Sequence, residues 1–71
     1  MKLLNSYSII DTEGHELPSV EIVKVDGVCF IDNMDMCTEI MVQDLATAKD
    51  IAQAMRNRNQ RNYNKKNGIR K

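Results

Sequence analysis

The dipeptide Asp26-Gly27 constrains the fold of this chain more than any other stretch of its 71 residues. It separates two apolar runs, residues 19–25 and residues 28–33, which are both rich in β-branched side chains. Asp-Gly between such runs is the strongest short-range signal for a β-hairpin with a two-residue turn. Because a two-residue turn fixes which residues lie opposite each other, the sequence predicts both a hairpin and its pairing register.

Both faces of this predicted hairpin are apolar. Alternate residues of a strand point to opposite faces of the sheet. One face then carries Val23, Val25, Val28 and Phe30, and the opposite face carries Val20, Ile22, Cys29 and Ile31. One helix can cover only one face, so the other face requires a second subunit or another partner.

We assign the partner-binding role to the second of these faces. Two methionines follow the hairpin, and methionine side chains adapt well to protein partners, although they also fill gaps in small cores. The predicted protein-binding residues are Val20, Ile22, Ile31, Met34 and Met36.

An amphipathic helix is predicted over residues 44–55. Its apolar residues recur at steps of three and four, which is the pattern of one buried helix face. Asp44 is a suitable N-cap because its carboxylate can accept from free backbone N–H groups of the first turn. A later start is an alternative, because Thr47 and Asp50 have the spacing of a capping box. The apolar positions are Leu45, Ala48, Ile51, Ala52 and Met55.

The rest of the chain before the helix is typical of strands and turns. Residues 6–11 and 15–17 predict the two arms of a first hairpin around a turn at residues 11–14. Pro18 is expected at a kink or a sheet edge because it lacks a backbone N–H. Residues 37–42 predict a further strand or a lead into the helix. The predicted fold is therefore α+β, a small antiparallel sheet of hairpins with three to five strands, followed by one C-terminal helix packed on one sheet face.

We predict a single domain over residues 1–56 and a basic tail over residues 57–71. Five asparagines dilute the tail with poor helix formers, so the helix is expected to fray between Arg56 and Arg61 and the chain to be disordered beyond. A domain of this size usually needs disulfides, a metal or a partner subunit for stability. Because two cysteines allow at most one disulfide, we expect a homodimer or a higher homo-oligomer.

Charge is distributed unevenly along the chain. Residues 1–55 contain three lysines and all ten acidic residues, which gives −7, and residues 56–71 contain seven cations and no acid, which gives +7. Such a tail can neutralise phosphates and, through a tyrosine, stack on a base. It can also serve as a solvated helix end, or pair with the acidic body of a neighbouring subunit. The nucleic-acid-binding candidates are Arg56, Arg58, Arg61, Tyr63, Lys65, Lys66, Arg70 and Lys71.

No sequence pattern indicates catalysis, a metal or a cofactor. Cys29 lies among apolar strand residues, where a cysteine is most often a small core side chain, and His15 lies beside a turn. Zinc usually requires two close pairs of ligands, which Cys29, Cys37 and His15 do not supply. Residues 32–35 lack the glycine and distal glutamate of a calcium loop. We therefore expect no enzyme activity, no cofactor and no metal.

The residues together favour a small binding or regulatory module that acts on an unidentified protein partner, with nucleic-acid binding as the alternative function. No signal peptide or membrane-spanning stretch is visible, so we expect a cytoplasmic protein without a membrane partner. In composition, the short chain rich in Asn and Lys resembles small accessory proteins of bacteriophages and mobile genetic elements, and no motif accompanies that resemblance.

Overall fold

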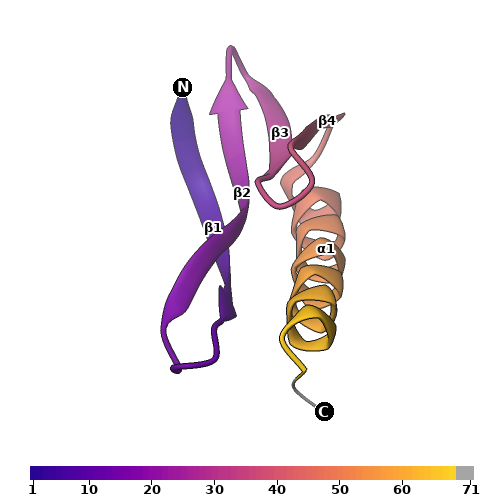
Figure 1. Cartoon of the computed structure of the whole chain (residues 1–71). Helices are drawn as coiled ribbons and strands as arrows, with labels where there is room; N and C mark the ends of the chain where they lie inside the picture. Colours follow the sequence, from indigo (N-terminus) through magenta and orange to yellow (C-terminus); the bar gives the residue numbers. More distant parts are fainter. Residues whose placement is uncertain (69–71) are drawn as a thin grey trace.

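The computed structural model of the chain describes residues 1–68 and contains one sheet and one helix (Figure 1). Four antiparallel strands follow one another along the chain and lie in the same order in the sheet. The helix packs on one sheet face, as the sequence predicted. The elements are β1 (Lys2–Ile10), β2 (Glu16–Val25), β3 (Val28–Asn33), β4 (Thr38–Val42) and α1 (Leu45–Lys66).

The turn between β2 and β3 has the predicted two-residue geometry. Asp26 and Gly27 have φ angles of 50° and 79°, which are the positive values that a type I′ turn requires at both central positions. The register is also the predicted one, because Val25 pairs with Val28 and Ile22 pairs with Ile31. The residues of the turn therefore determine how the two central strands, β2 and β3, pair with each other.

The pairing of β1 with β2 is interrupted by two irregularities. One lies between Leu3 and Asn5, and the second lies between Tyr7 and Ser8, where Pro18 pairs with Ser8. Proline has no N–H to donate to the hydrogen-bond ladder, and it is therefore tolerated at a bulge, where the ladder is already interrupted. The bulge turns both Ser19 and Val20 inward, and both are buried.

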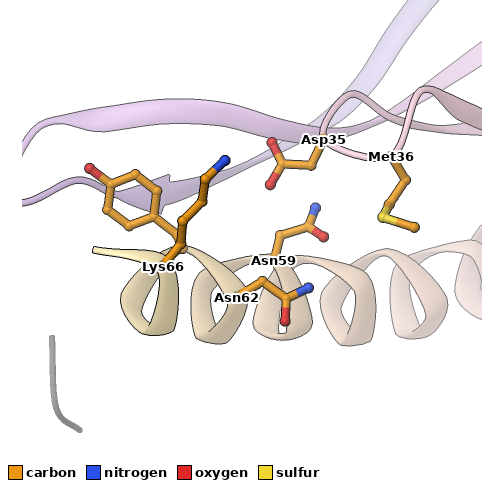
Figure 2. Close-up of a pocket in the computed structure, with 6 residues that line it drawn as sticks. Asp35, Met36, Asn59, Asn62 and Lys66 are labelled. Carbon is orange, nitrogen blue, oxygen red and sulfur yellow. The ribbon is translucent and has the colours of Figure 1, made fainter. Parts of the chain in front are cut away.

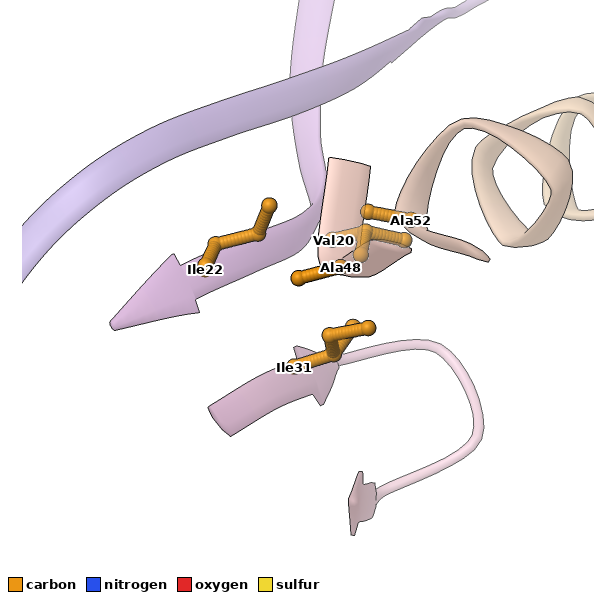
Figure 3. Packing of buried hydrophobic residues seen from close by; sticks show 5 residues of the cluster. All are labelled: Val20, Ile22, Ile31, Ala48 and Ala52. Atoms are coloured by element: carbon orange, nitrogen blue, oxygen red, sulfur yellow. The ribbon is translucent and has the colours of Figure 1, made fainter. Parts of the chain in front are cut away.

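The core lies between the helix and the middle of the sheet (Figure 3). Val20, Ile22 and Ile31 from the sheet and Ala48 and Ala52 from the helix are each 0% exposed. This corrects our assignment of Val20, Ile22 and Ile31 to a partner-binding face, because α1 covers that face. Hydrophobic alternation shows that a sheet has two apolar faces, but it does not show which one the helix of the same chain occupies.

The helix begins as predicted and ends much later than predicted. Asp44 caps it and accepts a hydrogen bond of 2.8 Å from the backbone N–H of Thr47. Fraying from Arg56 was expected, yet α1 continues through Lys66. The second half of the helix lies beside the part of the β1–β2 hairpin that extends past β3 and β4 (Figure 1). The molecule is consequently elongated, with extents of 41 × 19 × 17 Å.

Candidate functional site

The sheet face turned away from α1 carries an apolar row across all four strands. Leu3 pairs with Val23, Val23 with Phe30, and Phe30 with Met41. The outer members are well exposed, Leu3 to 55% and Met41 to 66%, whereas Val23 in the middle of the row is 9% exposed and Phe30 is half-buried between its neighbours. Val25 and Val28 form a shorter row beside it, next to the turn. We call these six residues the apolar patch: Leu3, Val23, Val25, Val28, Phe30 and Met41.

An acidic row borders the apolar patch on the same face. Glu21 pairs with Asp32, and Asp32 pairs with Glu39, so three carboxylates lie side by side on adjacent strands. Like charges directly opposite each other on neighbouring strands destabilise a sheet. A folded chain that keeps this arrangement presents an apolar surface with one strongly negative border.

The residues predicted to bind a protein therefore lie in two different places. Val20, Ile22 and Ile31 are buried beneath the helix, whereas Met34 is half-buried and Met36 is 53% exposed in the turn between β3 and β4. Sequence reading recognised the two apolar faces and chose the covered one. The face that α1 does not cover instead carries the apolar patch.

The basic residues of α1 are divided between structural contacts and the solvent. Arg56 Nε donates to the carbonyl oxygen of Ser8 at 2.7 Å, and the Tyr63 hydroxyl accepts from the backbone N–H of Thr12 at 3.2 Å. In contrast, the three side chains that we call the basic strip are exposed at helical spacings of three and four residues, on the side away from the core. The basic strip is Arg58, Arg61 and Lys65. The predicted candidates Arg70 and Lys71 lie outside the described residues.

A buried polar cluster joins the second half of α1 to the sheet, and sequence analysis missed it. Asn59 is 2% exposed, and its Nδ2 group donates to Ser19 Oγ at 2.7 Å and to Asn33 Oδ1 at 3.0 Å. The Asn33 oxygen also accepts from the backbone N–H of Met36 at 3.3 Å. Position 59 continues the spacing of Ala48, Ala52 and Met55, so the helical period was the signal that could have revealed it.

A groove of about 320 Å³ opens next to this cluster (Figure 2). Its helix wall is formed by side chains from the last turns of α1, and its other wall by the turn between β3 and β4. Lys66 and the Asp35 carboxylate reach toward the groove from opposite walls. The lining residues are Asp35, Met36, Asn59, Asn62, Tyr63 and Lys66.

The remaining candidate groups have local structural roles. Asp11 organises the first turn, where the backbone N–H of His15 donates to its carboxylate at 2.8 Å and lowers the pKa of that carboxyl, with a smaller contribution from the N–H of Glu13. Cys29 is buried and Cys37 is exposed, and both are free thiols. Within residues 1–68, no three His, Cys, Asp or Glu side chains converge in a way that could hold a metal ion.

Comparison with known proteins adds no family to these observations. No protein-family model, curated protein or solved structure matches this chain. In the described part of the chain, no helix combines the length and the apolar character needed to cross a bilayer. A functional conclusion therefore depends on the surfaces of the molecule itself.

Proposed function

We propose that this chain is a small, non-enzymatic binding protein that forms a homodimer through the apolar patch and acts by protein–protein interaction. The observation that carries the proposal is the four-strand row of Leu3, Val23, Phe30 and Met41 on the face that α1 leaves open. A contiguous apolar surface with a polar border is typical of protein interaction sites. A cytoplasmic location is part of the proposal, and the two free thiols, Cys29 and Cys37, are compatible with a reducing compartment.

A second copy of the chain is the occupant that fits this surface. In a two-fold symmetric pair, each apolar patch packs against its own copy, which satisfies the requirement for a self-complementary surface. The acidic row lies to one side of the patch, so a two-fold axis parallel to that row places the two acidic rows at opposite borders of the interface. In that arrangement the acidic row of one copy stays far from the acidic row of the other, and the carboxylates of both rows remain hydrated at little desolvation cost.

The size of the patch indicates a weak dimer. Four strands about 4.8 Å apart and six residues long, at about 3.4 Å per residue, give a face of roughly 400 Å² in projection. This is below the roughly 800 Å² per partner of a standard stable interface. We therefore expect dissociation in the micromolar range, where the dimer population depends on concentration.

Sedimentation equilibrium between about 5 and 500 µM tests the proposal. The mass should rise from the 8.1 kDa of one chain toward twice that value. Met41→Glu places a charge in the patch and should keep the chain monomeric, whereas Met36→Glu makes the same change in the turn between β3 and β4 and should leave association unchanged. A constant monomer mass over the whole range would refute the proposal, and so would equal effects of the two variants.

A further inference from the structure

We infer that the groove beside α1 binds one guanine base of a single-stranded nucleic acid, while the basic strip binds its phosphates. This site lies at the helix and the turn between β3 and β4, apart from the apolar patch, so it does not depend on dimer formation. Its walls combine an amide, a carboxylate, an ammonium group and an aromatic ring within one groove.

The buried amide of Asn59 is the first observation behind this assignment. Its side chain is 2% exposed, and both Nδ2 hydrogens are used in the bonds to Ser19 and Asn33. The amide oxygen takes part in neither bond. Because no fully buried side-chain nitrogen or oxygen within residues 1–68 lacks a hydrogen-bond partner, this oxygen is open to solvent on the groove side. Because Asn59 also lines the groove, this oxygen is an acceptor held in a fixed position for a donor from outside.

The hydrogen-bond acceptors that line the groove favour a base that offers hydrogen-bond donors. Asp35 supplies a carboxylate from the turn between β3 and β4, across the groove from Asn59 (Figure 2). A carboxylate accepts two parallel hydrogen bonds, and the Watson–Crick edge of guanine offers adjacent N1–H and N2–H donors. The amide of Asn62 can donate to the guanine O6 atom on the helix side. Among the four bases, guanine makes the fullest use of this set.

The side faces of the groove suit a flat ring. Tyr63 lines the groove, and its hydroxyl is fixed by the N–H of Thr12, so the ring is positioned rather than free to rotate away. Met36 supplies a polarisable thioether on the opposite wall. Stacking of bases on aromatic rings is the general mode of single-strand binding, and the base must be unpaired to enter.

The basic strip continues directly from the groove. Asn62 and Lys66 follow Arg58 at successive steps of four residues, so the groove and the strip are neighbouring rows of one helix surface. Arg58 and Lys65 are separated by a rise of about 10 Å along the axis. No acidic residue occurs after position 50, so the strip has no carboxylate on its own helix half to neutralise it.

Fluorescence anisotropy with labelled 12-nucleotide RNAs tests the inference. The oligonucleotide (UG)6 should bind roughly 5- to 100-fold more tightly than (UC)6, which is the discrimination expected of one bidentate base contact. Three cations on a single strand should give a slope of log affinity against log salt of about −2. The DNA oligonucleotide (TG)6 in a parallel arm shows whether the ribose contributes, and a duplex of the same length should bind more weakly because its bases cannot enter the groove.

Three substitutions separate the groove from the strip. Asp35→Asn should abolish the preference for (UG)6 and leave (UC)6 binding equal or tighter, because it removes both the acceptor pair and a negative charge. Arg61→Gln should weaken both oligonucleotides alike and reduce the salt slope by about 0.7. Lys49→Gln is the matched control, since it removes one exposed cation from the first half of the same helix and should change neither property.

The inference is overturned by any of three results. One is the absence of salt-dependent binding. Another is equal affinity for (UG)6 and (UC)6 that Asp35→Asn does not alter, and the last is equally tight binding of a polyglutamate of similar charge, which would indicate a general polyanion or acidic-protein site. The titration should also be repeated with Met41→Glu, which is expected to be monomeric. Because the groove does not depend on the dimer, this variant should bind RNA as the natural chain does, and the two proposals can therefore fail separately.

Discussion

The two halves of α1 pack against the same sheet by different forces. In the first half, Ala48 and Ala52 are completely buried against the branched side chains of β2 and β3. In the second half, Asn59 and Gln60 take the equivalent positions and reach the sheet through hydrogen bonds. One helix is thus held by apolar burial at its N-terminal end and by directional polar contacts at its C-terminal end.

The difference follows from what each half faces. The first half lies over the central strands β2 and β3, where apolar side chains of the sheet meet apolar side chains of the helix. The second half lies beside the extension of the β1–β2 hairpin, where β1 is an edge strand with free backbone groups. Gln60 accepts from the N–H of Ile10 at 2.6 Å and donates to its carbonyl at 2.9 Å, so its amide acts like the peptide group of a further strand.

Arg56 makes a related contact nearer the middle of the helix. Its Nε donates to the Ser8 carbonyl, and Pro18, which pairs with Ser8, has no N–H to offer that oxygen. The comparison teaches that a helix can extend past its apolar face when its polar side chains satisfy backbone groups that the sheet leaves open. It also predicts that substitutions in the two halves differ in size and in how far their effects spread.

The largest effect should come from a charge in the apolar half. Ala52→Asp places a carboxylate at a position that is 0% exposed, where a buried unpaired charge costs about 3–5 kcal/mol. We expect loss of the cooperative thermal transition in circular dichroism, or a large fall in Tm. Gln53→Asp changes the next, exposed residue and should be nearly silent; similar behaviour of the two variants would mean that the helix faces are assigned incorrectly.

The next effect should come from the buried amide of the polar half. Asn59→Ala removes the donor that Ser19 Oγ and Asn33 Oδ1 share. Asn33 Oδ1 keeps the N–H of Met36, whereas the buried Ser19 hydroxyl loses its partner, at a cost of about 1–3 kcal/mol. Urea denaturation should report this loss in the free energy of unfolding. Asn62→Ala is the control on the exposed side of the same turn. If both asparagines behave alike, the polar cluster is not a stabilising element.

Sequence reasoning recovered the parts of this fold that depend on local chemistry. The Asp26-Gly27 turn, the register of β2 with β3 and the Asp44 cap each follow from a few neighbouring residues. The length of α1 did not, because Asn59 and Gln60 have poor or neutral helix propensities and are held by partners 26 to 50 residues away. These partners are known only once the hairpin of β1 and β2 is placed.

The candidate site was less predictable than the fold, for the same physical reason. Alternation correctly indicated two apolar faces, but the choice between Ile22 and Val23 depends on where the helix docks. Tyr63 was predicted to be free for a base, and the structure ties its hydroxyl to Thr12 while leaving the ring beside the groove. Asp35 and Asn59 are distant in sequence and gain meaning only from their position on opposite walls of one groove.

A smaller and more local effect is expected at the edge contact of the polar half. Gln60→Ala removes both hydrogen bonds to Ile10, and at about 0.5–1.5 kcal/mol each their loss should not unfold the protein. Hydrogen exchange measured by NMR should accelerate at the Ile10 amide and remain unchanged at Ile22 and Ile31. Uniform acceleration across the sheet would show that the polar half stabilises the whole domain rather than its own end.

The smallest effect should appear in the pH dependence of the apolar half, at its cap. The backbone N–H of Thr47 donates to Asp44 and lowers the pKa of that carboxyl below its ordinary value of 3.8. Because the pKa of the Asp44 carboxyl is lower in the folded state than in the unfolded state, the carboxylate contributes its stability fully above the unfolded pKa and loses it as pH falls through the folded pKa.

Asp44→Asn keeps a capping oxygen but cannot titrate. The Tm difference between the two proteins should therefore be constant from pH 7 to about 5 and shift in favour of Asp44→Asn below pH 4, because only the natural chain loses an interaction there. Parallel Tm curves down to pH 2 would show that the charge of Asp44 contributes nothing beyond the cap itself.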